Sequence, residues 1–200
     1  MENDWYVVTP QYNNNDFVSD VIKEGEAAGF MEAEVDNAAP DIQSRDCKIS
    51  WIAKNEICQQ IVQLFGPIHE KVGYDIDALE ALQYTVYEKG QFYNWHQDNR
   101  AIYTKENEQT KHESWIGKTR KISATISLND DYEGGEMQIW QPAWFVGDEL
   151  PKGIVHSPGK KRGVAPAGTL IVFPSGMHHR VTPVTKGTRY SLVIWCLGKP

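Results

Sequence analysis

The sequence predicts a mainly β protein with flanking helices, an α+β arrangement in which helices pack outside an antiparallel sandwich or barrel. Helical patterns are confined to the first third of the chain, and strand-length apolar segments follow one another after about residue 80. Turn residues such as Glu88-Lys89-Gly90 and Gly134-Gly135 separate several of these segments. Many short strands without helices between them are typical of antiparallel sandwiches and barrels, and the helices-first order places the helices outside.

Three helical stretches are expected in the first part of the chain. The first has Asp16 as its N-cap and ends near Gly29. The second covers about residues 55–65, with an apolar face that stops at Gly66-Pro67. A third, shorter stretch is expected before Ala81, where the strand-rich part begins.

Several segments are expected to form strands: residues 47–52, 82–87, 122–128, 136–140, 169–173 and 189–197. Residues 122–128 alternate strictly, with Ser123, Thr125 and Ser127 on one face. This small polar face either lines a barrel, leaving room for a hydrophilic ligand, or faces solvent. Residues 99–119 and 141–163 are long and irregular, and the first of these stretches is expected to act as a lid or substrate-binding loop.

Length and charge limit the possible functions. The 200 residues suit a single domain, residues 1–200, with a helical part over about 1–80 and a strand-rich core over about 81–198. The formal net charge of -7 disfavours binding to DNA or to an anionic membrane, and no apolar run is long enough to span a bilayer. We interpret the small basic group of Lys118, Arg120 and Lys121 as a solvated strand end. No nucleic acid or membrane partner is expected, and the oligomeric state is left open.

The cysteine content indicates a reducing compartment. Cys47, Cys58 and Cys196 are odd in number and lack metal-binding spacing, which fits free thiols better than disulfides. Cys47 and Cys196 lie in apolar stretches and are expected to be buried. The first residues show no signal-peptide pattern, so we expect a cytoplasmic location.

A histidine and an aspartate two positions apart, His96 and Asp98, begin the most informative pattern in the chain. Such side chains point to the same side of an extended segment, so one metal ion can take both. Alone, this pair is better explained as an exposed turn after a strand. Far downstream, His179 heads another extended segment, with His178 as a spare beside it. Two imidazoles and one carboxylate are the protein ligands of non-haem Fe(II) sites, so His96, Asp98 and His179 are candidate catalytic residues.

Arg189 opens an otherwise apolar segment and shares one face with Ser191. A buried arginine needs an anionic partner. A bound dicarboxylate would supply that partner through a bidentate contact, with Ser191 adding a hydroxyl donor. Alternatively, Arg189 lies at a sheet edge and pairs with a surface Asp or Glu.

Taken together and in this order, these segments resemble a known enzyme family. The chain is similar to the Fe(II)/2-oxoglutarate-dependent dioxygenases, specifically the prolyl 4-hydroxylase-like branch of bacterial and phage type. The resemblance covers about residues 40–198, and its most specific part runs from His179 to Arg189. The matching segments are residues 45–51, 84–88, 96–99, 123–128, 132–136, 168–175 and 179–189.

The resemblance implies a double-stranded β-helix, or jelly roll, as the strand-rich core. It implies that His96, Asp98 and His179 bind Fe(II). It also implies that Arg189 binds the C5 carboxylate of 2-oxoglutarate and that Tyr87 hydrogen-bonds this co-substrate.

One part of the implied co-substrate pocket departs from the family pattern. Some relatives carry a second tyrosine on the strand before the Gly-Gly turn, whereas this chain has Ser127 or Thr125 at the matching position. The resemblance therefore places Ser127 beside the co-substrate and leaves that half of the pocket undetermined.

The resemblance also implies hydroxylation of an unactivated C–H bond, with 2-oxoglutarate and O2 as co-substrates, succinate and CO2 as products, and ascorbate as a candidate reductant. The expected target is a proline in a peptide or protein partner, as in procollagen-proline 4-dioxygenase-like hydroxylases. Alternative targets are a lysyl residue, a free amino acid or a nucleobase, and the alternative class is a catalytically silent jelly-roll binding module. Tyr93, Trp95, Tyr103 and Trp115 either form an aromatic slot for the target or serve as packing.

Overall fold

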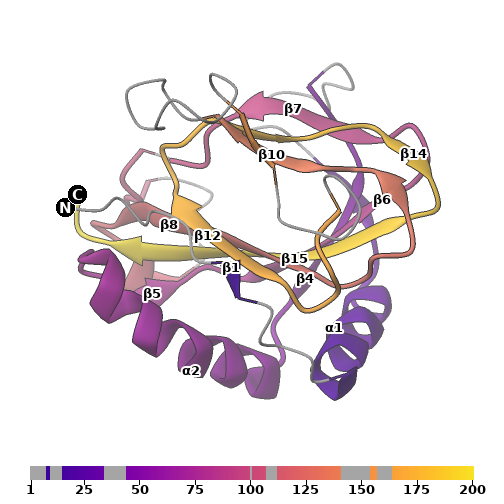
Figure 1. The fold of residues 1–200 in the computed structure, drawn as a ribbon. Helices are drawn as coiled ribbons and strands as arrows, with labels where there is room; N and C mark the ends of the chain where they lie inside the picture. Colours follow the sequence, from indigo (N-terminus) through magenta and orange to yellow (C-terminus); the bar gives the residue numbers. More distant parts are fainter. Residues whose placement is uncertain are drawn as a thin grey trace.

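The computed structural model describes residues 8–9, 15–33, 44–99, 101–106, 112–140, 154–156 and 164–200. Two antiparallel sheets face each other, and two α-helices lie on the outer side of the larger sheet (Figure 1). None of the described helices is long and apolar enough to cross a membrane.

The larger sheet has the strand order β1-β12-β8-β15-β6-β4-β2, with β5 paired to β15, and the smaller sheet has the order β11-β10-β13-β7-β3. The larger sheet consists of β1 Val8–Thr9, β2 Met31–Glu32, β4 Lys48–Ile52, β5 Ala78–Leu79, β6 Leu82–Tyr87, β8 Thr119–Ser127, β12 Leu170–Pro174 and β15 Arg189–Gly198. The smaller sheet consists of β3 Arg45–Asp46, β7 Phe92–His96, β10 Met137–Trp140, β11 Ile154–His156 and β13 His179–Val181. A separate short pair is formed by β9 Glu133–Gly134 and β14 Val184–Lys186.

From β6 onward, the strands that build the two sheets alternate between them, except that β10 and β11 follow one another as an antiparallel pair in the smaller sheet. Strands β6, β8, β12 and β15 belong to the larger sheet, and β7, β10 and β13 belong to the smaller one. The chain therefore winds around one central space, as a jelly roll does. This arrangement confirms the expected mainly β class with a double-stranded β-helix core and helices packed outside.

Helices α1 Asn15–Ala27 and α2 Asn55–Val72 cover the outer face of the larger sheet because each carries an apolar stripe at helical spacing. Their buried side chains meet the outward-facing apolar residues of the central strands in the largest core cluster. This layer contains Phe17, Val21, Ile57, Ile61 and Phe65 from the helices, and Leu82, Tyr84, Ile122, Ala124, Ile126, Leu192 and Ile194 from the sheet.

Helix α2 continues beyond the expected stop at Gly66-Pro67 and ends at Val72, where Gly73 caps it with a φ of 68°. A proline inside a helix removes one backbone hydrogen bond, at a cost of about 3 kcal/mol. The longer helix brings Tyr74 and Ile76 against the apolar core, which helps to offset that loss. The separate third helix expected before Ala81 is wrong, because the described residues that follow Gly73 are extended and include β5.

Strand β8 separates an apolar face from a polar face, as its alternation predicts. Ser123, Thr125 and Ser127 are 0%, 5% and 4% exposed. The alternative in which this polar face meets solvent is therefore wrong. Ile122, Ala124 and Ile126 pack in the helix-covered apolar layer, so the three small side chains lie on the opposite face of β8, the face turned away from the helices.

The long stretch of residues 99–119 is tied to the barrel near both of its ends. Tyr103 and Trp115, the latter in a 3-10 turn at Glu113–Trp115, are 2% and 6% exposed and pack with Leu197. The backbone N–H of Tyr103 donates to the carbonyl of Lys118, and that of Gly117 donates to the carbonyl of Tyr103, both at 2.9 Å. These two aromatics belong to the core, which agrees with the packing alternative for them.

Two other sequence-based expectations concern the second long stretch and the cysteines. Strand β11 lies within residues 141–163, where no strand was expected, and the rest of that stretch is outside the described residues. Cys47 and Cys196 are buried and Cys58 is partly buried, and all three are free thiols. This confirms the filler role expected for Cys47 and Cys196.

Candidate metal and co-substrate site

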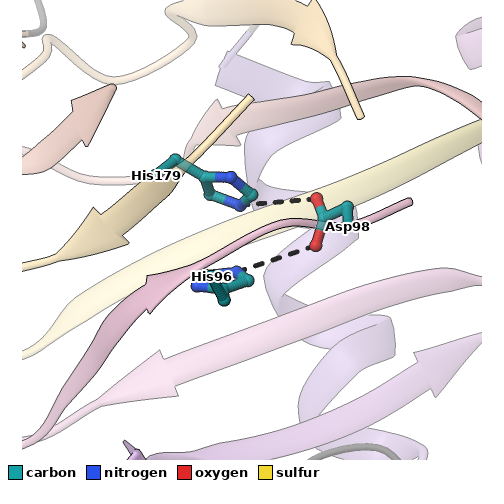
Figure 2. Close-up of side chains that lie close together, drawn as sticks. All are labelled: His96, Asp98 and His179. Carbon is teal, nitrogen blue, oxygen red and sulfur yellow. Dashed lines mark ion pairs between the residues drawn. The ribbon is translucent and has the colours of Figure 1, made fainter. Parts of the chain in front are cut away.

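His96, Asp98 and His179 converge at one end of the smaller sheet (Figure 2). His96 ends β7 and His179 begins β13, and the two residues are direct partners in the antiparallel register. Asp98 follows β7 by two positions, and its carboxylate points toward the rings of His96 and His179. This is expected because residues two positions apart in an extended segment point to the same side. The candidate ligand atoms of the three side chains all lie within 4.8 Å of one another.

The hydrogen bonds of the two histidines determine which ring nitrogen faces the centre. His96 Nδ1 lies 2.7 Å from the carbonyl of Asn94, and His179 Nδ1 lies 2.9 Å from the carbonyl of Met177. A carbonyl only accepts, so each Nδ1 carries the hydrogen and donates it. Each Nε2 therefore presents a lone pair, at 3.6 Å and 3.4 Å from the Asp98 carboxylate. Three acceptors that face one another need a cation between them, which is the environment of a metal site.

Burial and charge keep these groups in the forms that a metal requires. Burial lowers the pKa of His96 to about 3, and the neighbouring His179 adds to this effect. Burial alone would raise the pKa of Asp98, but His179, His96 and Arg120 outweigh it and hold that pKa well below its usual range. At neutral pH His96 is thus a neutral imidazole and Asp98 a carboxylate, so neither must lose a proton to bind a metal.

The surrounding contacts fix the orientation of the three side chains. The backbone N–H groups of Asp98 and Asn99 donate to the carbonyl of Ser175 at 2.8 and 2.9 Å. The ring of Tyr93 stacks on His96 with centroids 3.5 Å apart, and the ring of Phe173 lies 4.6 Å from that of His179. The site is therefore held by both sheets before any ligand arrives.

The residues expected to bind a co-substrate lie together on the inner face of the larger sheet. In the strand register Arg189 is opposite Tyr87, and Ser191 is opposite Ser127. All four residues are buried. The guanidinium of Arg189 lies 5.3 Å from the Tyr87 ring and donates to Ser191 Oγ at 2.9 Å.

Arg189 is 3% exposed, and within the described part of the chain no carboxylate pairs with it. The alternative of a surface ion pair at a sheet edge is therefore wrong. The hydroxyls of Thr125 and Thr169 are also buried without a hydrogen-bond partner. A buried cation beside unsatisfied hydroxyls fits a hydrophilic, anionic ligand such as 2-oxoglutarate.

Three further residues near the site lie outside the ligand cluster. His178 is exposed and its ring lies at right angles to that of Trp140, so it stands outside the cluster, as expected for the spare histidine. Trp95 is 37% exposed beneath the guanidinium of Arg180, at 4.8 Å. Sequence reasoning missed the buried side chain of Arg45, although its two-residue spacing from Cys47 could have placed both on one face.

A jelly roll that carries two histidines and one aspartate beside a buried arginine has the features of the non-haem iron oxygenase class. The family model of the 2OG-Fe(II) oxygenase superfamily matches residues 82–197 of this chain. The chain belongs to this superfamily.

Individual relatives lie in the prolyl hydroxylase-like part of the superfamily. A PKHD-type hydroxylase of Synechococcus sp. (strain JA-3-3Ab) is 38% identical over 76 residues, which is 37% of this chain and only 27% of that protein. A Pseudomonas putida prolyl-4-hydroxylase has a similar fold, with a TM-score of 0.66, 22% identity, and coverage of 96% and 92% of the two chains. A Trichoplax adhaerens prolyl hydroxylase in complex with a hypoxia inducible factor peptide fragment gives a TM-score of 0.66, 16% identity, and coverage of 96% and 83%.

Proposed function

We propose that this protein is an Fe(II)- and 2-oxoglutarate-dependent dioxygenase that hydroxylates an unactivated C–H bond of a peptidyl proline, with release of succinate and CO2. The observation that carries the proposal is the convergence of the His96, Asp98 and His179 acceptor atoms, together with a buried Arg189 for which the described residues supply no carboxylate partner. The chain's family membership supports the same chemistry. We further propose that residues 1–200 act as one domain.

The proposed roles follow from what each side chain presents. His96, Asp98 and His179 would hold Fe(II), which would supply the oxidising chemistry with O2. Arg189 grips the C5 carboxylate of 2-oxoglutarate, with Ser191 as a second donor.

The pocket on either side of Arg189 is completed by two further residues. Tyr87 closes the side facing β6, since it lies directly opposite Arg189 in the register. Ser127 leaves more room on the β8 side than a tyrosine would, so Thr125 and ordered water complete the contacts there.

The choice of proline rests on the relatives and on the mouth of the site. The similar proteins are named as PKHD-type and prolyl hydroxylases, and one of the structures holds a peptide. The ring of Tyr93 stacks on His96 and provides aromatic surface there that suits a pyrrolidine ring, whereas Trp95 lies under Arg180. We take ascorbate as the reductant that restores Fe(II). The free thiols of all three cysteines support a reducing compartment, the cytoplasm.

The decisive experiment is an anaerobic titration of the protein with Fe(II) and 2-oxoglutarate, followed by absorption spectroscopy. We expect a weak visible charge-transfer band in the wild type and in His178→Ala, and none in His179→Ala. A peptide library exposed to O2 should then gain the mass of one oxygen at proline. Absence of the band in the wild type would contradict the metal and co-substrate assignment.

The peptide screen separates the remaining alternatives. If the oxygen is added to lysine, to a free amino acid or to a nucleobase, the proposed reaction is correct but proline is not the substrate. Binding of 2-oxoglutarate with no succinate formed would indicate a silent binding module.

A further inference from the structure

Arg45 is a second buried guanidinium beside the metal ligands, and no role has yet been assigned to it. It lies on β3 in the smaller sheet, directly opposite Tyr93 of β7, and is 8% exposed. Its Nε donates to Cys47 Sγ at 3.1 Å, and its Nη2 donates to Gln83 Oε1 at 2.8 Å. Its guanidinium carbon lies 4.5 Å from the centre of the Tyr93 ring.

All of these partners of Arg45 are neutral. Burial raises the pKa of Cys47, so this residue remains a thiol at neutral pH. Gln83 offers an amide oxygen, and Tyr93 offers the face of its ring. The adjacent Asp46 is used elsewhere, since its Oδ1 accepts from Gln91 Nε2 at 2.8 Å. Among the residues that the structure describes, no carboxylate forms an ion pair with Arg45.

A buried charge without a counter-charge is unfavourable, and a bound anion would remove that penalty. A guanidinium has five N–H donors, and the described contacts of Arg45 use only two of them. The remaining donors are available to a planar, two-oxygen acceptor, and a carboxylate matches them in bidentate geometry.

The position of Arg45 connects it to the reacting centre. The Tyr93 ring contacts the Arg45 guanidinium and also stacks on His96, with ring centroids 3.5 Å apart. Arg189, by contrast, belongs to the larger sheet and faces Tyr87 of β6. Among the described residues, each sheet therefore carries one buried arginine, Arg45 or Arg189, that has no carboxylate partner. A single 2-oxoglutarate has one distal carboxylate for Arg189, which leaves Arg45 without an anion.

We propose that Arg45 binds a carboxylate of the substrate, so that the hydroxylated molecule carries an acidic group close to the C–H bond that is attacked. This inference rests on the iron and 2-oxoglutarate chemistry of the proposed function and specifies a chemical group that the substrate carries. Two sources share the required chemistry: the α-carboxylate of a free amino acid or terminal residue, and the side chain of an acidic residue next to the target within a peptide.

The first test measures binding to the enzyme loaded anaerobically with Fe(II) and 2-oxoglutarate. Two matched pairs are titrated by calorimetry: L-proline against L-prolinamide, and a blocked Ala-Pro-Asp peptide against blocked Ala-Pro-Asn. We expect the acid member of at least one pair to bind ten times more tightly or better, and the pair that discriminates identifies the source. Arg45→Gln should abolish that preference. Acid and amide members that bind alike, or that both fail to bind, would overturn the inference.

A second test needs no substrate. Gln83→Glu places a carboxylate of the same shape at the atom that already contacts Arg45, so we expect the ligand-free protein to unfold at a higher temperature and the acid preference to disappear. Gln83→Met is the matched control, which keeps the size and removes the hydrogen bond. A lower melting temperature for Gln83→Glu than for Gln83→Met would show that the Arg45 charge is already compensated.

The two proposals fail in distinguishable ways. If the wild type shows no charge-transfer band with Fe(II) and 2-oxoglutarate, the proposed function fails. If the band forms but the acid preference is absent, only the Arg45 inference fails. A raised KM for 2-oxoglutarate in Arg45→Gln, with the acid preference retained, would assign Arg45 to the co-substrate and overturn the inference.

Discussion

Two regions of the jelly roll bury arginine in opposite ways. Arg120 at the start of β8 donates from Nε and Nη2 to the two carboxylate oxygens of Glu80, both at 2.6 Å. Its guanidinium also lies 3.8 Å above the Trp195 ring. Arg45 and Arg189 are as deeply buried but have neutral partners within the described chain. The chain neutralises the first charge itself, which suits a structural tie, and leaves the other two for ligands, which suits a binding site.

The paired region holds the loop and one metal ligand in place. Tyr103 donates its hydroxyl to Glu80 at 2.7 Å, so the ion pair anchors the start of the long stretch after the metal ligands. Arg120 Nη1 also reaches the carbonyl of Asp98 at 3.4 Å. This region therefore supports the site through contacts that the chain itself supplies.

The largest effect is expected in the binding region, which contains the proposed metal ligands, Arg45 and Arg189. Substitutions there should reduce enzyme activity. His96→Ala, Asp98→Ala and His179→Ala should each reduce turnover by a thousandfold or more, on the order seen when residues act as one unit. Each change removes one of three ligands from the metal. Succinate release is the measurement, and His178→Ala is the control that keeps substantial activity. If His178→Ala is inactive while His179→Ala retains iron, the assignment within the histidine pair is wrong.

Substitutions in the paired region, which contains the Arg120–Glu80 ion pair, should reduce the stability of the fold. Glu80→Gln or Arg120→Gln leaves one buried charge without its partner, and we expect a loss of about 3–5 kcal/mol in the free energy of unfolding. The double variant should recover part of that loss, because both charges are then gone. Urea unfolding of the four proteins measures the effect. Single variants that lose less than about 1 kcal/mol would remove the contrast between the two regions.

Arg189→Lys tests the other half of this contrast, an arginine that is proposed to bind a ligand and has no carboxylate partner among the described residues. Lysine keeps the charge but loses the planar fork, and we expect transition-state stabilisation to fall by about 2–3 kcal/mol, mainly through a higher KM for 2-oxoglutarate. Stability should change little, since the described partners of Arg189 are neutral: the Ser191 hydroxyl and the Tyr87 ring. An unchanged KM would show that the dicarboxylate is held elsewhere.

Much of this arrangement was predictable from the sequence, and the exceptions share one physical cause. Strand alternation placed Ser127 on the inner face, and the spacing of His96 and Asp98 placed both on one side. The end of α2 beyond Pro67 and the burial of Tyr103 were missed, because contacts distant in sequence decided them. The pairing of Arg120 with Glu80 was missed for the same reason. A local pattern reveals a charge but does not reveal whether a distant strand supplies its partner.

A pH effect of intermediate size follows from the low pKa of His96. The unfolded chain binds a proton at His96 below about pH 6.5, whereas the folded protein does so only near pH 3. The unfolded state therefore holds more protons in this window, and the metal-free protein loses stability as the pH falls from 6.5 toward 3. Asp98, whose pKa is also lowered, adds to the loss below about pH 4. The urea midpoint should fall with the pH across this range, and the slope above pH 4.5 should be smaller in His96→Gln.

The smallest effect is expected from Tyr103→Phe, which removes one hydrogen bond from the paired region and keeps its charges. The lost bond goes to a buried carboxylate, so we expect about 1–2 kcal/mol less stability. In the proposed function the strands hold iron and 2-oxoglutarate, whereas a peptide would approach beside the loop that Tyr103 anchors. Hydroxylated peptide should therefore decrease more than succinate formed without peptide, and one assay can follow both products. A parallel decrease in the two would mean that the loop supports the barrel and has no separate part in substrate capture.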